Sequence, residues 1–487
     1  MNRIIALTLS VTALLTSCSG PKDELDTKIE SGFSDQKLDA REAAELRQFI
    51  TDNGDKLADE KATASLSEGG DAALLAYLKR SKAYRDIRNE TGKPPVIELE
   101  GSAGQSLELK LYLEASGSMF PYDAPGSSGD FKRTLNQVIN GFEAVTPDKT
   151  ELFVVNTEVN PLGLSQSQFT KAQNIFNVAK TKGKTTSTDF ELIFSQILKQ
   201  TGGSDISVLA SDLIYSDPTL RGQSVDKTLN AAEALMTTVF GNYANTHSML
   251  VVKLTSDFDG PYYPAAGGTV RHRGERPYYL CFIGQNAAMQ QFMQDEKYAT
   301  LRDFRDLPGY DDFWFFTRNK AATEPYFSVL LNDPGKKGRF ARADRDEKGI
   351  HTLEDVEAAP DKSLRIPVAV DLSKLNLPES FMTDKTQFEI AGKDNFKVEK
   401  VEVYRGGGAT HKIWLLASKP ARGTRTAVIR LKRDFPPRWV AETSTRNDAR
   451  PDAESTFGLQ NLLQGVESAY NASGQEQFFA LTLTLKD

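Results

Sequence analysis

Apolar strand-like runs alternate with amphipathic helical segments between residues 105 and 305. This alternation is typical of an α/β fold, in which a parallel or mostly parallel sheet carries helices on both faces. Ligands of such sheets bind outside the carboxyl ends of the strands. The strands are expected at 107–114, 151–156, 206–212, 248–255 and 278–284, and the helices at 131–144, 166–179, 189–199, 226–240 and 287–301.

The segment before this domain has helical periodicity. Residues 31–100 carry apolar side chains at helical spacing in two stretches, 39–54 and 71–88. They are therefore expected to form a helical stalk. Residues 18–30, which precede the stalk, are expected to be a linker.

The segment after the α/β domain has the periodicity of strands. In residues 306–487 apolar side chains recur with a period of two, and turn sequences such as "RGGG" and "KPARGT" separate the runs. This pattern predicts a C-terminal β-sandwich domain with one inserted helix at 456–470. Its strands are expected at 364–371, 396–404, 412–417, 426–431 and 478–485.

The N-terminus has the features of a secretory signal. A short basic start precedes an apolar run at 4–15, which is too short to span a bilayer comfortably. The sequence "LTSC" at 15–18 resembles the lipobox of bacterial lipoproteins. That resemblance implies a signal peptide at 1–17 and acyl chains such as palmitate on Cys18, and two or more chains are enough for stable anchoring. The alternative is an ordinary secretory signal with a chance cysteine.

The residues after Cys18 bear on localisation. "SGPKDE" resembles the Lys-acidic-acidic signal that exports some Gram-negative lipoproteins to the outer face of the outer membrane. The expectation is a lipid-anchored outer-membrane protein that is exposed at the cell surface, with the periplasmic face as the alternative. The formal net charge of −7 gives no reason to expect a nucleic-acid partner. The one further cysteine, Cys281, is predicted to be a buried core thiol.

Three oxygen-rich turns lie at the expected ends of strands or at a helix start. "EASGS" places Glu114, Ser116 and Ser118 after the first strand, "TTSTD" at 185–189 precedes a helix, and Asp212 ends the third strand. Because the carboxyl ends of parallel strands share one edge of a sheet, these turns can converge. Hydroxyl and carboxylate oxygens are the ligands that hard cations prefer.

In this order the turns resemble the metal-ion-dependent adhesion site of the von Willebrand factor type A domain. The family pattern is Asp-x-Ser-x-Ser on the first loop, Thr on the second and Asp on the third. The resemblance implies a Rossmann-like, doubly wound domain that binds Mg²⁺, or else Mn²⁺ or Ca²⁺. Ser116, Ser118 and a threonine would bind the ion through oxygen, Asp212 would act through bound water, and an acidic group of a ligand would complete the octahedron. Thr188 fits the helix-start position, and Thr186 is its close competitor.

This chain has Glu114 where the family has Asp. One further methylene lengthens the side chain by about 1.5 Å, which does not fit an unchanged octahedron of oxygens at about 2.0–2.1 Å. Two alternatives follow. Glu114 either takes the place of a water on the ion, or accepts hydrogen bonds within a turn that holds no metal.

A second candidate surface is the stretch "DGPYYPAAGGTVRHRGERPYY" at 259–279. It combines Tyr262 and Tyr263 with Arg271 and Arg273, residue types that are enriched at binding hot spots. The alternatives are a loop that contacts a ligand and a long solvated insertion.

No enzyme motif is present in the sequence. A nucleophilic serine in the first turn would need a Gly-x-Ser-x-Gly elbow and a histidine base. No catalytic residue is expected, and the chain is predicted to be an adhesion or assembly module that binds a protein or glycan ligand. A metal-free scaffold of an envelope or secretion complex and an envelope hydrolase are the alternatives. The four histidines, which are expected to be surface or loop residues, are His247, His272, His351 and His411.

Overall fold

The computed structural model of the chain has two compact units, residues 1–104 and 105–487. The expected signal peptide at 1–17 and Cys18 lie outside the residues that the structure describes. Within the described residues, no helix combines the length and the apolar character needed to cross a bilayer. The structure describes residues 20–34, 37–38, 40–58, 70–91, 95–97, 106–186, 188–215, 222–265, 267–318, 325–343, 349–392 and 395–487.

The first unit is a small helical bundle. Leu25 and Ile29 from its first helix, Leu46 and Ile50 from its second and Leu78 from its fourth are buried in one core. The linker expected at 18–30 is wrong from Pro21 onward, because Pro21 opens a helix there, a position that suits proline. The elements are α1 (Pro21–Gly32), β1 (Lys37–Leu38), α2 (Ala40–Asp52), α3 (Gly54–Ala58), α4 (Gly70–Arg80), α5 (Lys82–Thr91) and β2 (Val96–Ile97).

Among the described residues of the second unit, seven strands form one mixed sheet in the order β5-β4-β3-β6-β8-β7-β9. Only the β3–β4 and β3–β6 pairs are parallel, so the expected mostly parallel sheet is wrong at its other pairs. The reason is that β7 and β8 form a long hairpin without a crossover helix between them. The strands are β3 (Glu108–Glu114), β4 (Thr150–Val155), β5 (Val159–Pro161), β6 (Asp205–Ser211), β7 (His247–Tyr262), β8 (Val270–Gln285) and β9 (Tyr310–Phe316).

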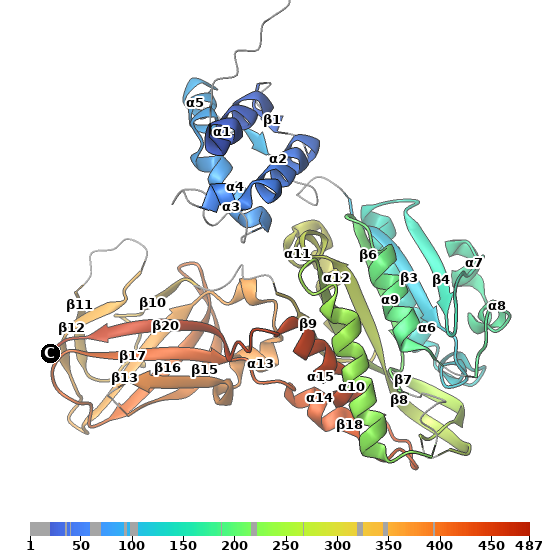
Figure 1. Cartoon of the computed structure of the whole chain (residues 1–487). Helices are drawn as coiled ribbons and strands as arrows, with labels where there is room; N and C mark the ends of the chain where they lie inside the picture. Colours follow the sequence, from blue (N-terminus) through green and yellow to red (C-terminus); the bar gives the residue numbers. More distant parts are fainter. Residues whose placement is uncertain are drawn as a thin grey trace, which may run out of the picture. The chain divides into compact units, whose positions relative to one another are not determined.

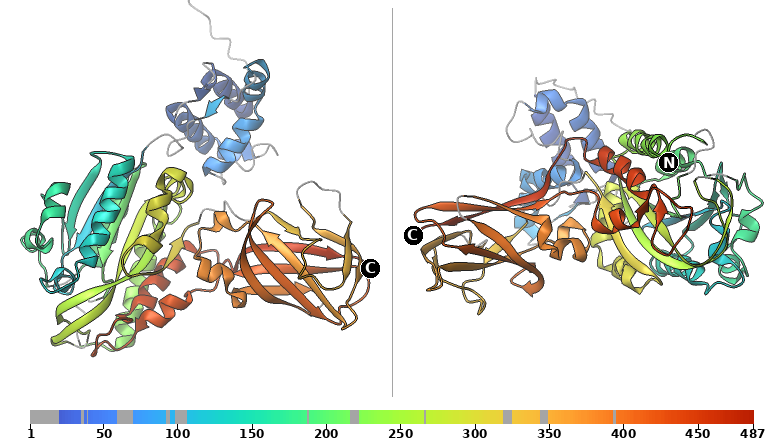
Figure 2. Two further views of the ribbon diagram at one scale, coloured as in Figure 1. Left: turned by 180° about the vertical axis from the view of Figure 1, so that it is seen from behind. Right: turned by 90° about the horizontal axis from the view of Figure 1, so that it is seen from below.

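Helices cover both faces of this sheet, as the sequence predicts. Along β3, Tyr112 points into one buried core with Ile193, while Leu111 and Leu113 point into another with Phe131. Figure 1 and the left view of Figure 2 show the sheet from opposite sides. The helices are α6 (Asp130–Val145), α7 (Gln166–Lys171), α8 (Phe176–Ala179), α9 (Phe190–Gln200), α10 (Val225–Gly241), α11 (Asn286–Gln294) and α12 (Ala299–Arg302).

Two further sheets follow, with the strand orders β10-β13-β16-β15 and β11-β12-β20-β17-β14. Ile413 and Leu415 from the first of them and Ile429 and Leu481 from the second belong to one buried cluster. The strands are β10 (Phe327–Val329), β11 (Arg339–Arg342), β12 (Thr352–Glu357), β13 (Ser363–Val370), β14 (Phe388–Gly392), β15 (Phe396–Gly406), β16 (Ala409–Ser418), β17 (Arg425–Lys432) and β20 (Gln477–Leu485).

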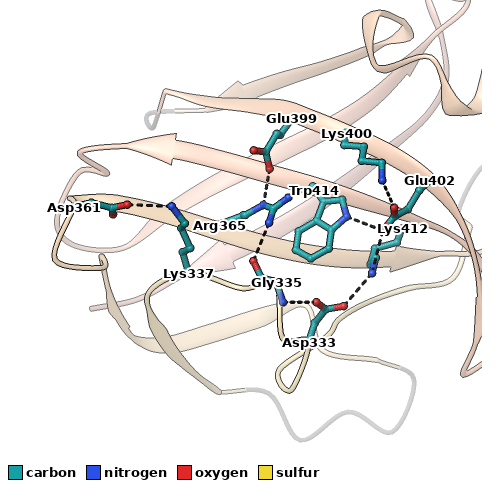
Figure 3. A network of polar contacts seen from close by, with 10 residues as sticks. All are labelled: Asp333, Gly335, Lys337, Asp361, Arg365, Glu399, Lys400, Glu402, Lys412 and Trp414. Atoms are coloured by element: carbon teal, nitrogen blue, oxygen red, sulfur yellow. Dashed lines mark hydrogen bonds and ion pairs between the residues drawn. The ribbon is translucent and has the colours of Figure 1, made fainter.

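The side of the four-stranded sheet that faces away from this cluster carries a set of charged side chains around Trp414 (Figure 3). The Arg365 guanidinium and the Lys412 ammonium lie 4.0 Å and 4.6 Å from the indole ring. The indole Nε1 donates to Glu402 at 2.9 Å, and Glu402 also pairs with Lys400 and Lys412. We call these five residues the Trp414 network.

Segments beyond residue 305 complete the α/β layers, so the expected boundary at 305/306 does not divide the fold. β9 is an edge strand of the mixed sheet. The helix expected inside the sandwich, α15 (Leu459–Tyr470), instead packs on α10, where a Cβ at Gly465 would lie 2.2 Å from the Glu233 carbonyl oxygen. α14 (Arg438–Thr443) precedes it. Between them, residues 444–457 carry the short parallel strands β18 (Ser444–Thr445) and β19 (Thr456–Phe457), and we call this segment the C-terminal strap.

Candidate functional site

The candidate site lies at the carboxyl ends of β3 and β6. These strands are parallel neighbours, and Leu113 lies opposite Ala210 in their register. The next residue on each strand is therefore Glu114 or Ser211, which brings two polar side chains together at one edge of the sheet. This placement follows from the strand order, since Glu114 and Ser211 are 97 positions apart in the sequence.

Glu114 is fully buried at this edge. Its Oε1 accepts a hydrogen bond from the Thr188 hydroxyl at 2.6 Å, and its Oε2 accepts one from the Ser211 hydroxyl at 2.5 Å. Burial, together with the negative charge of Asp212, raises the pKa of Glu114 to about 7, although hydroxyl groups around it oppose the shift. Glu114, which is one methylene longer than the Asp of the von Willebrand A pattern, therefore reaches a hydroxyl group with each of its two carboxylate oxygens.

Ser116, Ser118 and Asp212 lie beside Glu114. The two serine hydroxyls are 2.9 Å apart, and Asp212 is 2 % exposed. Burial raises the pKa of Asp212, while hydrogen bonds from Ser118 and from the Ile214 backbone act in the opposite direction. Two buried carboxylates at one site are costly to keep ionised together, and a cation lowers that cost.

The loop before α9 provides the third part of the site. Its Thr185 carbonyl oxygen accepts from the backbone N–H of Gly117 at 2.9 Å, which joins this loop to the first turn. Asn156 is buried at the end of β4. Its side-chain amide donates to the Lys182 carbonyl oxygen, and its backbone carbonyl oxygen accepts from the Asp189 N–H. Through these bonds Asn156 positions the loop, a role that its sequence context gave no sign of.

The two competing threonines are placed differently. Thr188 is 9 % exposed and donates to Glu114. Thr186 is exposed, and no described contact brings it to the carboxylates. Ser187, which lies between them, is outside the described residues. Of the two threonines, the structure therefore brings Thr188 to the site.

The stretch at 259–279 is mostly part of the β7–β8 hairpin, so the expected loop is wrong along its strands. Tyr262 is fully buried and donates to Asp448, which excludes it as a surface contact. Tyr263 is 46 % exposed, and its ring lies over Gly117, where a Cβ would be 3.0 Å from Cε2. An aromatic side chain therefore flanks the first turn of the site.

Two of the three arginines in β8, Arg271 and Arg273, are exposed. Both Arg271 and Arg273 pair with Asp259. They carry positive charge near the tip of the hairpin, with no described contact to Glu114 or Asp212. Arg276, in contrast, is 1 % exposed and contributes to the electrostatics of Asp212. In the sequence Arg276 belongs with Arg271 and Arg273 to the residue types enriched at binding hot spots, and its burial excludes it as a surface contact.

The described residues of the site contain no histidine that contacts Ser116 or Ser118. His247 and His411 are buried in β7 and β16, so the expectation that they are surface or loop residues is wrong. His272 also lies on a strand, in β8. Cys281 is a buried free thiol in β8, which confirms the prediction for it, and burial raises its pKa above the usual range.

The side chains of the site carry hydroxyl and carboxylate oxygens, which are the ligand types that hard cations prefer. Oxygen-bearing side chains converge there from three turns, and only two of them are carboxylates. Within the described residues, no group of three or more His, Cys, Asp or Glu side chains could hold a metal, so the hydroxyls are needed as ligands. The residues concerned are Glu114, Ser116, Ser118, Thr188 and Asp212.

Compared with known proteins, the chain matches no protein-family model, no curated protein and no solved structure. The candidate function therefore depends on the residues of the site and on their geometry.

Proposed function

We propose that this chain is a membrane-anchored binding protein that recognises an acidic group of a protein or glycan ligand through a divalent cation. The cation is Mg²⁺, with Mn²⁺ or Ca²⁺ as substitutes. One observation carries the proposal: hydroxyl and carboxylate oxygens from three separate turns converge at the carboxyl edge of β3 and β6, around two buried carboxylates.

Each residue of the site has a defined role in this proposal. Ser116, Ser118 and Thr188 hold the ion through their hydroxyl oxygens, and Glu114 and Asp212 neutralise its charge directly or through water. The ion supplies a positive charge with an open position, which the carboxylate of a ligand fills. The exposed ring of Tyr263, beside the first turn, adds an apolar contact for the ligand.

The proposal includes a von Willebrand A-like domain, a β-sandwich and an outer-membrane location. The order of the three turns along a sheet with helices on both faces supports a von Willebrand A-like domain. The two further sheets with a shared buried cluster support a β-sandwich. The lipobox-like "LTSC" supports acylation of Cys18 and an outer-membrane location.

Titration calorimetry of the purified chain with MgCl₂ and MnCl₂ tests the metal site. Wild type is expected to bind one equivalent, and the double variant Ser116→Ala, Ser118→Ala is expected to bind none while its melting temperature without metal stays close to wild type. If wild type binds neither ion, the proposal fails. If Glu114→Asp then binds where wild type does not, the turn is a degenerate relic of a metal site.

A metal-free scaffold is the second candidate, and one observation favours it. Both oxygens of Glu114 already accept hydrogen bonds, one of them from the candidate ligand Thr188. A turn in which both carboxylate oxygens are already hydrogen-bonded can be stable without a bound ion. The two candidates differ in their response to EDTA, because chelation abolishes capture of a partner through a cation and leaves a metal-free interface unchanged.

A further inference from the structure

A cavity of about 270 Å³ lies in the second unit, and none of the residues that line it belongs to the candidate metal site. Its floor is buried and includes Trp314 of β9 and both Glu467 and Tyr470 of α15. Its rim is exposed and includes Gln294 at the end of α11 and Lys374. Sites for drug-sized ligands begin at roughly 300 Å³, so this cavity suits a smaller ligand, of the size of a single sugar unit.

Positive charge exceeds negative charge in this cavity. Among the described residues that line it, the charged ones are the cations Arg318, Lys374 and Arg433 and a single carboxylate, Glu467. Arg318 is already engaged, since its guanidinium donates to the carbonyl oxygens of Ala469 and Tyr470 at the end of α15. Arg433 and Lys374 are therefore the cations that remain for a ligand.

Arg433 is held in place with one end of its guanidinium free. Its side chain is 10 % exposed, its Nε donates to Glu467 Oε1 at 2.8 Å, and its guanidinium carbon lies 5.6 Å from the centre of the Phe478 ring. Nη1 and Nη2 have no hydrogen-bond partner in the described part of the chain, and both remain accessible to solvent. Two donors side by side at the end of a guanidinium match the two oxygens of a carboxylate.

The surroundings of Arg433 favour a ligand with one negative charge over a ligand with two. Glu467 lies against Arg433, and the C-terminal end of α15 adds a partial negative charge. Both repel a phosphate group, with up to two charges, more strongly than a carboxylate. Lys374 is exposed at the rim, has no ion pair with any described residue, and attracts an approaching anion.

The uncharged part of the lining matches a sugar. Gln294, Asn376 and Gln475 lie at or near the rim, and the amide groups of their side chains have no hydrogen bond to another described residue. A side-chain amide both donates and accepts hydrogen bonds, as the hydroxyl groups of a sugar do. Trp314 and Phe478 add apolar surface for the C–H groups of a ring.

We propose that this cavity binds a sugar acid, which is a hydroxylated ring that carries one carboxylate. Arg433 binds the carboxylate through its two Nη groups, Lys374 attracts it at the rim, and the amides bind the hydroxyl groups. Glu467 is a positioning residue that keeps Arg433 in this orientation. The inference goes beyond the proposed function, because it concerns a second site that needs no cation.

Titration calorimetry of the purified chain with D-glucuronate tests the cavity. Wild type is expected to bind with a dissociation constant of about 1 mM or lower, and D-glucose, which lacks the carboxylate, is expected to bind about tenfold more weakly. Arg433→Lys keeps a positive charge for Glu467 but loses the two Nη donors, so glucuronate binding is expected to weaken about tenfold. Lys374→Gln is expected to weaken it about threefold, and its matched control Lys385→Gln, at an exposed lysine outside the cavity, is expected to leave it unchanged.

Methyl β-D-glucuronide distinguishes the two sources of such a ligand, because its anomeric oxygen carries a substituent as in a glycan. Binding equal to that of glucuronate identifies the terminal unit of a glycan as the ligand, while loss of binding identifies a free sugar acid. Both results support the sugar-acid site. Glucose 6-phosphate that binds more tightly than glucuronate would overturn the choice of a carboxylate.

EDTA and the double variant Ser116→Ala, Ser118→Ala separate this cavity from the proposed metal site. Glucuronate binding is expected to be the same under both changes, and its loss under either would place the sugar acid at the metal site and overturn the inference. An affinity equal to wild type in a folded Arg433→Lys or Lys374→Gln protein would also overturn it, as would a wild type that binds no glucuronate. None of these results changes the binding of Mg²⁺ or Mn²⁺, so the proposed function stands or fails separately.

Discussion

Two polar clusters of this chain show opposite electrostatics. In the Trp414 network, one carboxylate lies among three cations, and hydrogen bonds from Lys400 and the Trp414 indole lower the pKa of Glu402 to about 2 (Figure 3). At the candidate site, two carboxylates are buried together, and the pKa of Glu114 is raised to about 7. The first arrangement favours the ionised form, while the second disfavours it.

The difference separates stability from function. Oppositely charged side chains that are paired at a surface stabilise the folded state slightly, and they do so without a bound ion or ligand. Buried like charges weaken the folded state, and they persist where a site uses them. We therefore expect substitutions in the Trp414 network to change stability alone, and substitutions at the candidate site to change metal affinity, with effects on stability of the opposite sign.

Trp414→Ala is expected to have the largest effect. Trp414 is 5 % exposed and packs between two cations, so its removal leaves a cavity and two unstacked charges. Truncation of such a side chain lowers the free energy of unfolding by about 3 kcal/mol. Urea denaturation followed by circular dichroism measures the change.

The control is Trp414→Phe, which keeps an aromatic ring but loses the hydrogen bond from the indole to Glu402. It is expected to lower the free energy of unfolding by about 1 kcal/mol. Mn²⁺ affinity is expected to be unchanged in both variants. A loss of affinity in Trp414→Ala would contradict the separation of the two clusters.

The second effect concerns the two threonines of the loop before α9. Thr188→Ala is expected to weaken Mg²⁺ binding by about 10- to 100-fold, because its hydroxyl is both a candidate ligand and a donor to Glu114. Thr186→Ala, two residues away and exposed, is expected to leave binding unchanged. Calorimetry on the pair decides the assignment, and equal effects of the two substitutions would refute it.

Glu114→Gln is expected to have a smaller effect, in the direction of higher stability. The amide can still hydrogen-bond to Thr188 and Ser211, while the repulsion between two buried carboxylates disappears. At pH 8 and without metal, we expect the free energy of unfolding to rise by about 1 kcal/mol, and Mg²⁺ binding to be lost. A destabilised but folded Glu114→Gln protein would mean that Glu114 has a purely structural role.

The sequence predicts the parts of the site that depend on local pattern. A run with period two that ends in "EASGS" places Glu114, Ser116 and Ser118 at a strand end, whatever the neighbouring strands are. The bond from Ser211 to Glu114 is different, because it exists only if β3 and β6 are adjacent and in register. Strand order is a property of the whole sheet, and local pattern does not contain it.

Two further features show the same limit. The paired strands β7 and β8 continue through residues 256–262 and 270–276, where Pro261 and two glycines, Gly260 and Gly274, resemble loop sequence although β7 still alternates in burial there. The burial of Arg276 depends on the C-terminal strap, which arrives from the far end of the chain. Both outcomes follow from tertiary packing that overrides local preference.

The smallest expected effect is the acid response of the Trp414 network. The pKa of Glu402 is about 2 in the folded protein, against an ordinary value of 4.5, so the unfolded chain takes up a proton at higher pH than the folded one. The stability that Glu402 contributes is therefore complete above pH 4.5 and is lost as pH falls from 4.5 towards 2. Because the side chain is 27 % exposed and its partner Lys400 is 59 % exposed, the contribution is at most about 1 kcal/mol. Urea denaturation at several pH values in this window is expected to show a shallower decline for Glu402→Gln than for wild type, and parallel declines would mean that the ion pairs around Trp414 contribute no net stability.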